Sequence, residues 1–373
     1  MQKKKVGILT FSYSSNGGSV MQAVALQKTI SSFDGFEASI IHYSKTTYGK
    51  PVIGKDVFTK PIRTWTPKKV IKWTAKMAAH PFKMRKFEKF FVKHYNNFSS
   101  HPYSRDELAS LNDVYDKFVV GSDQVWNFGS HQVDETYYLD FVTDNSKKIA
   151  YAPSFGQKNV PEEKREVASR LISDFYAVSV REPDGLKIVS DLTARKAAWV
   201  LDPSLLLPKE EYQKLSKAPK EKGYVYLYIR QESDRLEAFA EKLANAYGLR
   251  VVKVLNNWLC GKDGKRKAPI GPHHWLGYIE NADFVVTNSF HGICFSTIFE
   301  KEFFVDFLEK TSTATNSRLE GMLQQFNFKN RCIDDVSDIH SLPRIDYTDV
   351  NQFKQRRIDE SLDYLKNALE GSL

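Results

Sequence analysis

Short apolar runs alternate with amphipathic segments along most of the chain, and this pattern predicts the fold. Residues 6–11 form an apolar run bounded by turn residues, which indicates a buried strand, and residues 20–30 carry apolar side chains at helical spacing. A glycine-containing loop joins the two. A strand, a glycine loop and a helix in this order are typical of the start of a doubly wound α/β domain.

The same alternation continues through both halves of the sequence. Further strands are predicted at 38–43, 117–120, 149–152, 177–180, 199–201, 224–229, 250–255, 284–287 and 303–307, and further helices at 232–247, 275–281, 292–299 and 351–369. A polar, lysine-rich stretch at 208–222 separates the halves. We therefore predict an α/β fold of two Rossmann-like domains facing a cleft, with an N-terminal domain over 1–205, a C-terminal domain over 206–349, and a terminal helix over 350–373 that packs back on the N-terminal domain.

The alternation breaks between Lys60 and Lys93, where eleven basic residues accompany a single acid. This segment has a net charge of +10, whereas the other residues together sum to −1. We predict a basic helical insertion at about 60–95 in the N-terminal domain, built from helices at 69–79 and 81–95 that Pro81 separates. Phe87, Phe90 and Phe91 fall on one face of the second helix, and lysines fall on the other.

Two interpretations of the basic insertion remain open. Its aromatic and lysine faces suit contact with an anionic membrane surface. Alternatively, the aromatic side chains pack into the protein and the lysine face is merely solvated. Because the rest of the chain is nearly neutral, basic surface throughout is excluded, and no nucleic-acid partner is expected.

The overall composition is that of a globular protein, with 373 residues, 42% hydrophobic and 27% charged. Cys260, Cys294 and Cys332 form no CxxC pair, so neither a zinc site nor a disulfide framework is indicated, and we expect no metal and no cofactor. No run approaches the roughly 20 apolar residues of a membrane span, and the apolar stretch near the N-terminus is too short for a secretion signal. We expect a cytoplasmic protein, with any contact to the inner face of the cell membrane made through the segment Lys60 to Lys93.

Polar residues cluster where the strand predicted at 284–287 gives way to a helix. Asn288, Ser289, His291 and Gly292 lie at this junction. Ligands of α/β sheets bind at the carboxyl ends of the strands, and a helix N-terminus offers free N–H groups to a phosphate or carboxylate. Ser289 suits an N-cap that also binds a ligand oxygen, and His291 suits a general acid. The alternative is a purely structural helix cap.

A second polar cluster follows the strand predicted at 117–120. Asp123, Gln124 and Asn127 offer a carboxylate and two amides, and Trp126 offers a flat apolar face. Sugars are bound by such mixtures of polar and aromatic groups. The alternative is a capped turn with Trp126 in the core.

A glycine loop and three arginines complete the candidate residues. The loop at 14–19 has neither a GxGxxG nor a P-loop pattern, so it fails as a dinucleotide signal and is expected to approach the cleft closely. Arg181 and Arg230 follow predicted strands directly, and Arg318 lies further along the chain. Arginines at strand ends suit bidentate capture of a carboxylate or phosphate, although a surface salt bridge is the alternative for each.

Five blocks, taken in order, resemble the polysaccharide pyruvyl transferase family. They are NGGS at 16–19, GSDQVWN at 121–127, YAPSFG at 151–156, SVRE at 179–182 and VTNSFHG at 286–292, the last followed by NSR at 316–318. The resemblance implies a fold like that of the two-domain GT-B glycosyltransferases. It also implies transfer of a pyruvyl group from phosphoenolpyruvate to two hydroxyls of one sugar, which forms a cyclic ketal in a surface polysaccharide such as a capsule or exopolysaccharide. The acceptor would be bound to a polysaccharide or linked to polyprenyl pyrophosphate.

The resemblance and the residue chemistry together give the candidate site. His291 is expected to act as the acid at the phosphoenolpyruvate site, with Asp123 as the base for a hydroxyl. The remaining candidates are Asn288, Ser289, Gly292, Arg181, Arg230 and Arg318 for the donor, and Gly17, Gly18, Gln22, Gln124, Trp126 and Asn127 for the acceptor. Some family members have an arginine where this chain has Phe290, so either the charge of the donor is met elsewhere or the donor differs. A glycosyltransferase that uses a nucleotide sugar, and a non-catalytic sugar-binding relative, are the alternative functions.

Overall fold

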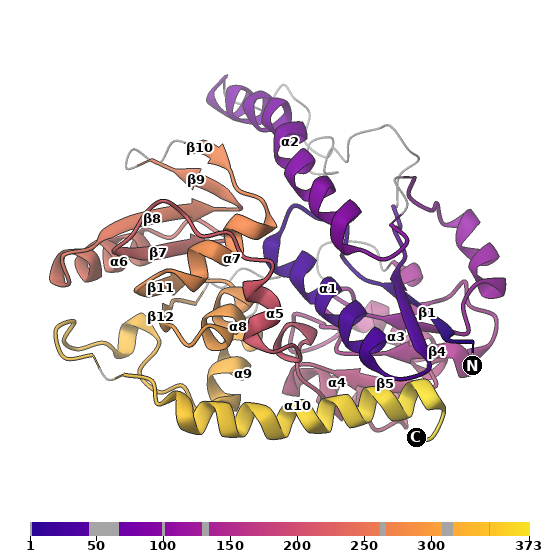
Figure 1. Ribbon diagram of the computed structural model, residues 1–373. Coiled ribbons are helices and arrows are strands. Elements are labelled where there is room, and N and C mark those ends of the chain that lie inside the picture. Colours follow the sequence, from indigo (N-terminus) through magenta and orange to yellow (C-terminus); the bar gives the residue numbers. More distant parts are fainter. Residues whose placement is uncertain are drawn as a thin grey trace.

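The computed structural model describes residues 2–44, 67–98, 101–128, 134–261, 266–307, 316–342 and 344–373. These residues form two six-stranded sheets, which lie side by side with helices packed around them (Figure 1). The predicted α/β fold with two sheet domains is confirmed. The exact domain limits at 205 and 349 stay a prediction.

The first sheet is entirely parallel and has the order β2-β1-β3-β4-β5-β6. Its strands are β1 (Lys4–Leu9), β2 (Phe36–Ile40), β3 (Lys117–Val120), β4 (Lys148–Ala150), β5 (Ala177–Val180) and β6 (Ala198–Trp199). The helices of this half are α1 (Gly17–Ser32), α2 (Pro67–His94), α3 (Glu162–Ser173) and α4 (Pro183–Leu192), with short 3-10 turns at η3 (Asp106–Asp113), η4 (Glu135–Tyr138), η5 (Asn145–Lys147) and η6 (Pro203–Leu205). The strands are short apolar runs because both faces of a parallel sheet are buried.

The second sheet has the order β10-β9-β8-β7-β11-β12 and is parallel except at one edge. Its strands are β7 (Tyr224–Ile229), β8 (Arg250–Leu255), β9 (Trp258–Cys260), β10 (Arg266–Pro269), β11 (Phe284–Thr287) and β12 (Glu302–Val305). Strands β9 and β10 are antiparallel and extend the edge beyond β8. The helices are α5 (Lys209–Gln213), α6 (Asp234–Ala246), α7 (Pro272–Glu280), α8 (Phe290–Ile298) and α9 (Ser317–Gln325), with a 3-10 turn at η7 (Ile333–Asp335).

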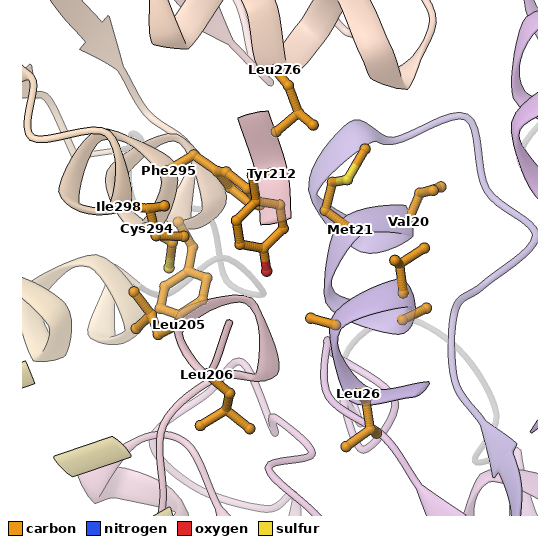
Figure 2. Packing of buried hydrophobic residues seen from close by; sticks show 14 of the residues in the cluster. Val20, Met21, Leu26, Leu205, Leu206, Tyr212, Leu276, Cys294, Phe295 and Ile298 are labelled. Carbon is orange, nitrogen blue, oxygen red and sulfur yellow. The ribbon is translucent and has the colours of Figure 1, made fainter. Parts of the chain in front are cut away.

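The two domains share one hydrophobic core. Helix α1 and the turn η6 from the first half pack against α7 and α8 from the second half. Figure 2 shows Met21 of α1 and Leu205 of η6 on either side of Tyr212, with Phe295 of α8 next to it. Tyr212 and Phe295 are fully buried, and removing such apolar area from water is the main force that holds the domains together.

The terminal helix α10 (Tyr347–Glu370) contacts both halves of the molecule. Near its start, the Tyr347 hydroxyl donates to the Lys301 carbonyl at 2.6 Å. Further along, the Ser361 hydroxyl accepts from the Leu201 backbone N–H at 3.0 Å, and Arg357 donates to the Trp199 carbonyl at 2.7 Å. The helix runs as a strap across the base of both domains (Figure 1).

The basic insertion differs from its prediction in two respects. Helix α2 is one continuous helix with Pro81 inside it, not two helices. Its aromatic face points into the protein, where Phe87, Phe90 and Phe91 are almost completely buried. A proline in a helix costs about 3 kcal/mol, and burying three phenylalanines at about 1.5–3 kcal/mol each more than offsets that cost. Lys60 and Arg63 lie outside the described residues.

No helix in the described part of the chain is both long enough and apolar enough to cross a membrane.

Candidate active site

A cavity of about 440 Å³ lies between the two domains, at the carboxyl ends of the central strands. In each sheet the first strand, β1 or β7, is flanked by the second and third parallel strands of its half, so the connections leave it in opposite directions. Such switch points are where α/β sheets bind ligands. The cavity is lined from both switch points, by Thr10, Phe11, Ser12, Tyr13, Ser14, Asn16, Ser19, Tyr43, Asp123, Gln124, Tyr137, Arg230, Asn288, Ser289, Phe290, His291 and Arg318.

The glycine pair at the start of α1 sets how closely the domains approach. A Cβ atom on Gly17 would lie 2.6 Å from the Trp275 ring, and one on Gly18 would lie 2.3 Å from the His291 ring. Neither distance is tolerable, so the two glycines allow α1 to pack directly on α7 and α8. Both glycines are buried and lie outside the cavity lining. Gln22 is fully buried as well, and its amide donates to Thr10 Oγ1 and to the Ser19 carbonyl, both at 2.9 Å.

His291 stands in the first turn of α8, next to the cavity. Ser289 caps this helix, with its side chain accepting from the Gly292 N–H at 3.4 Å. The Asn288 amide ties two strand ends together, since its oxygen accepts from the Arg230 N–H and its nitrogen donates to the Gln231 carbonyl, both at 2.8 Å. Asn288 therefore positions the loop, and Ser289 and His291 are presented to the cavity at a helix N-terminus.

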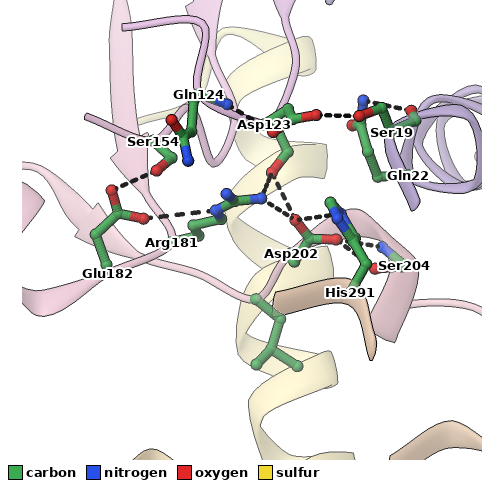
Figure 3. A network of polar contacts seen from close by, with 12 residues as sticks. Ser19, Gln22, Asp123, Gln124, Ser154, Arg181, Glu182, Asp202, Ser204 and His291 are labelled. Carbon is green, nitrogen blue, oxygen red and sulfur yellow. Dashed lines mark hydrogen bonds and ion pairs between the residues drawn. The ribbon is translucent and has the colours of Figure 1, made fainter. Parts of the chain in front are cut away.

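Asp202 faces His291 from the other domain (Figure 3). Its Oδ2 lies 3.9 Å from His291 Nε2, and this nitrogen is buried without a hydrogen-bond partner. Ser204 donates to Asp202 Oδ1 and Ser122 donates to Oδ2. Burial alone would raise the pKa of Asp202, but His291, Arg181 and these hydroxyls bring it to about 2, so the carboxylate is charged at neutral pH.

Burial governs the protonation of His291. It lowers the pKa of the imidazole below its usual value, and Asp202 and Asp123 counteract the shift, whereas Arg181 and Arg318 add to it. His291 is thus neutral at pH 7, and a bound dianion would favour its protonation.

Arg181 forms ion pairs with two carboxylates and does not line the cavity. Its side chain is 1% exposed, and its Nη1 lies 2.7 Å from Asp202 Oδ2, while Nε lies 3.5 Å from Glu182. The guanidinium also stacks on the Phe290 ring, 4.3 Å from the ring centroid. Asp202, Glu182 and Asp123 outweigh burial and raise the pKa of Arg181. The structure therefore places Arg181 behind the cavity wall, where it holds Asp202, and not at the surface where a donor would bind.

Asp123 lines the cavity from the end of β3. Its φ is +72°, a left-handed conformation that only glycine, asparagine and aspartate adopt readily. In this conformation its oxygens accept from the Ser19 hydroxyl and from the Gln124 backbone N–H. Burial would raise the pKa of Asp123, but His291, Arg181 and these hydrogen bonds lower it, so the group is an anion at neutral pH.

Gln124, from the polar cluster that follows β3, contacts Arg318. With its amide oxygen turned toward Arg318, Gln124 accepts from Arg318 Nε at 3.1 Å and from Nη1 at 2.5 Å. Gly156 packs against the Gln124 side chain and has a φ of +63°. A Cβ atom at this position would lie 2.9 Å from Gln124 Cδ, so glycine is needed here. Glu182 fixes that loop by accepting from Ser154 Oγ at 2.7 Å and the Phe155 N–H at 2.9 Å. The YAPSFG and SVRE blocks thus meet behind Gln124.

Trp126 and Asn127 lie away from the cavity. The Trp126 ring is 1% exposed, stacks on Tyr138 at 5.1 Å between centroids, and donates through Nε1 to the Tyr137 carbonyl. It therefore has no open face for a sugar, and the alternative of a core tryptophan describes it. Asn127 donates to Gln124 Oε1 at 2.7 Å in the alternative orientation of that amide.

Arg230 and Arg318 are the cations that face the cavity. Neither has a carboxylate within ion-pair distance among the described residues. Burial, with the like charge of Arg181, lowers the pKa of Arg318 to about 10, which still leaves it protonated at pH 7. Two guanidiniums without anionic partners beside a helix N-terminus have the chemistry to bind an anion.

One comparison with known proteins decides the family. A model of the family described as polysaccharide pyruvyl transferase matches residues 16–305, which is well over half of the chain. This chain belongs to the polysaccharide pyruvyl transferase family. It is accordingly a transferase, and the resemblance seen in the five sequence blocks is confirmed. A comparison with curated protein sequences finds no match.

Solved structures resemble this polysaccharide pyruvyl transferase family member only distantly. A UDP-GlcNAc 2-epimerase from Methanocaldococcus jannaschii is 12% identical, with 97% of this chain and 100% of that chain covered and a TM-score of 0.49. The N-terminal domain of trehalose-6-phosphate phosphatase from Candida albicans is 10% identical, with 100% and 98% covered and a TM-score of 0.48. Likeness at these identities does not extend to chemistry.

The sequence patterns missed Asp202, a buried neighbour of His291 and Arg181 in the candidate site. Asp202 lies in an Asp-Pro-Ser stretch that resembles an ordinary turn, although it comes shortly after β6, which ends at Trp199. Its position after a parallel strand, like that of Asp123, was the available signal. Within the described ranges, no group of three or more histidine, cysteine, aspartate or glutamate side chains is arranged to hold a metal ion.

Proposed function

We propose that the protein transfers a pyruvyl group from phosphoenolpyruvate to two hydroxyls of a sugar, forming a cyclic ketal in surface polysaccharide synthesis. One observation carries this proposal: Arg230 and Arg318 face the same cavity as His291 and have no carboxylate partner among the described residues. Phosphoenolpyruvate presents a phosphate and a carboxylate on adjacent carbon and oxygen atoms. Two guanidiniums and the N-terminus of α8 supply matching positive groups.

The reaction balances without any group other than donor, acceptor and protein. A proton adds to the methylene carbon of phosphoenolpyruvate and makes the neighbouring carbon electrophilic. The first sugar hydroxyl attacks this carbon and loses its proton, the bond to phosphate oxygen breaks, and phosphate leaves with the electron pair. The second hydroxyl then attacks the same carbon and loses its proton. Of the two protons released, one replaces that added to the methylene group and the other leaves with phosphate.

His291 and Asp123 are the proposed proton carriers. The donor phosphate favours protonation of His291, which then acts as the acid toward the methylene carbon. Nε2 of His291 is buried and faces Asp202, so we assign the proton transfer to Nδ1. Asp123 is an anion at the opposite wall and accepts the proton of an attacking hydroxyl. Ser289 contributes its hydroxyl at the donor end, whereas Gly292 does not line the cavity and its N–H donates to Ser289.

The acceptor is a sugar on a polysaccharide or on a polyprenyl pyrophosphate carrier. The cavity walls that remain for it after the donor is placed carry hydroxyl and aromatic side chains, including Thr10, Tyr13 and Tyr137. Such groups bind sugar hydroxyls and C–H faces. We propose that these residues, with Gln124, take the acceptor role that the sequence suggested for Trp126.

The test is an assay with phosphoenolpyruvate and a panel of oligosaccharide and lipid-linked sugar acceptors. We expect release of inorganic phosphate together with an acceptor that gains the mass of a pyruvate ketal, and both products should disappear in His291→Asn. Arg250→Met, which changes an exposed arginine of β8, serves as the control. Thermal stabilisation by a nucleoside diphosphate but not by phosphoenolpyruvate would overturn the proposal in favour of a nucleotide-sugar enzyme.

A further inference from the structure

The outward face of α2 carries a stripe of cations and apolar side chains. Phe82 is 63% exposed and Val92 is 70% exposed, and the exposed Arg85, Lys89 and Lys93 lie between and beside them. Their spacing of three and four residues puts all five on one side of the helix. None of the three cations has a carboxylate partner among the described residues. We call these five residues the α2 stripe.

The opposite face of α2 is fixed to the body of the protein. Phe87 and Phe91 are completely buried, and Lys83 Nζ donates to the Asn256 carbonyl of the second domain at 2.7 Å. The helix cannot turn its aromatic face outward without exposing this core. A partner that meets the described side chains of α2, residues 81–94, must therefore meet the α2 stripe.

We propose that the α2 stripe docks the protein on an anionic phospholipid surface. The charge argument is specific to this region, because the segment Lys60 to Lys93 carries +10 while the rest of the chain sums to −1. Basic side chains close to an anionic bilayer contribute roughly 1 kcal/mol each. Exposed apolar side chains such as Phe82 and Val92 enter the headgroup boundary. Cations and apolar groups on one helical face are the combination that an anionic membrane surface selects.

The docking helix is connected to the cavity. The Tyr13 hydroxyl donates to Glu88 Oε1 of α2 at 2.6 Å, and the Tyr95 hydroxyl, just after α2, donates to the Ser12 carbonyl at 2.9 Å. Ser12 and Tyr13 line the cavity. In Figure 1, α2 extends along one end of the molecule above both sheets. A membrane at the α2 stripe would thus lie near the residues that line the site. The inference deepens the proposed function, because a lipid-linked acceptor is found at such a surface, but the docking itself requires no chemistry in the cavity.

The experiment is co-sedimentation of the full chain with vesicles, without donor or acceptor. Vesicles of phosphatidylcholine alone are compared with vesicles that also contain phosphatidylglycerol. We expect binding only to the anionic vesicles, and a partition coefficient at least about tenfold lower in the double variant Arg85→Glu and Lys89→Glu. The double variant Phe82→Ser and Val92→Ser should weaken binding at high salt, where the charges are screened. The matched control reverses two exposed cations of the second domain, Lys242→Glu and Arg250→Glu, and should bind like the unchanged protein.

The outcomes separate this inference from the proposed function. Equal binding to both kinds of vesicle, or equal loss in the Arg85 and Lys89 variant and its control, would overturn it. So would tight binding to a duplex oligonucleotide that the same variant abolishes while vesicle binding is unchanged. If anionic vesicles bind as expected but no ketal forms in the assay above, the docking surface stands and the proposed chemistry fails. The variant should retain full activity on a water-soluble acceptor, which shows that its fold is intact.

Discussion

Arg181 and Arg318 both lie between the two domains, Arg181 buried and Arg318 half-buried. They differ in their partners, because carboxylates surround Arg181 but not Arg318. Arg181 contacts Asp202 and Glu182 and is covered by the Phe290 ring. Arg318 contacts the uncharged Gln124 and has no carboxylate partner among the described residues, as is true of Arg230. An arginine that is paired with carboxylates inside the protein stabilises the fold, whereas an arginine without a carboxylate partner is available to bind an anionic ligand.

The largest expected effect is on stability at Arg181. In Arg181→Met the carboxylates of Asp202 and Glu182 lose their cation while they remain buried. Removing one partner of a buried ion pair costs about 3–5 kcal/mol, so the urea midpoint of unfolding should fall strongly. Arg250→Met, at an exposed position of β8, is the control and should leave the midpoint within error.

The pH dependence of unfolding gives a second measurement on Arg181. Because the pKa of Asp202 is about 2 in the folded protein and 3.8 is its ordinary value, its stabilising contribution is complete above about pH 4 and is lost as pH falls toward 2. In Arg181→Met the pKa of Asp202 should rise, so this acid-induced loss of stability should become smaller. An unchanged midpoint and an unchanged acid limb would mean that Arg181 is not the paired cation described above.

The second effect concerns donor binding at Arg318. We expect Arg318→Met to raise the KM for phosphoenolpyruvate by about 30- to 100-fold, since hydrogen bonds to charged groups contribute about 1.5–3 kcal/mol. Stability should stay the same or rise, because the group is held in the protein without an anion. Arg318→Lys keeps the charge without the bidentate geometry, so its KM for phosphoenolpyruvate should lie between those of the unchanged protein and Arg318→Met. A loss of stability like that of Arg181→Met would erase the distinction between the two arginines.

A third, smaller effect is expected at Asp202, which connects Arg181 to His291. Asp202→Asn keeps the shape and a hydrogen-bond acceptor but removes the charge that favours protonated His291. We expect kcat to fall by about 10- to 30-fold with a nearly constant KM, and the alkaline limb of the kcat–pH profile to move to lower pH. If only stability changes and the pH profile stays in place, Asp202 has no positioning role toward His291.

The sequence predicted the parallel strands but missed some shorter elements. The parallel strands were found within a few residues because both of their faces are buried and their apolar runs are unbroken, as at Phe284–Thr287. The β9–β10 edge was missed because short edge strands lack such a run. Helix α4 was missed as well, although Pro183 at its first turn is a typical start signal.

Position after a strand predicted which residues meet at the domain interface, but not which way each one points. Arg181, Arg230, Asp123 and His291 do converge, as expected from the ends of parallel strands. Whether an arginine is paired depends on Asp202, which is 21 residues away along the chain from Arg181. Long-range pairing of this kind has no local sequence signal. The same holds for Gly18, whose role is to admit His291 from the other domain.

The smallest predicted effect is at Arg230, which lies half-buried at the cavity wall. Its backbone N–H holds Asn288, so substitution of the side chain leaves that loop contact in place. We expect Arg230→Gln to raise the KM for phosphoenolpyruvate by about five- to tenfold, because a half-buried cation at the cavity wall is screened by water and salt. The effect should shrink at high ionic strength, whereas that of Arg318→Met should persist, because Arg318 is desolvated enough for burial to lower its pKa. Arg230→Lys should restore most of the binding. Equal salt dependence at both positions would place the two arginines in the same electrostatic environment, and the donor phosphate and carboxylate could then not be assigned to them separately.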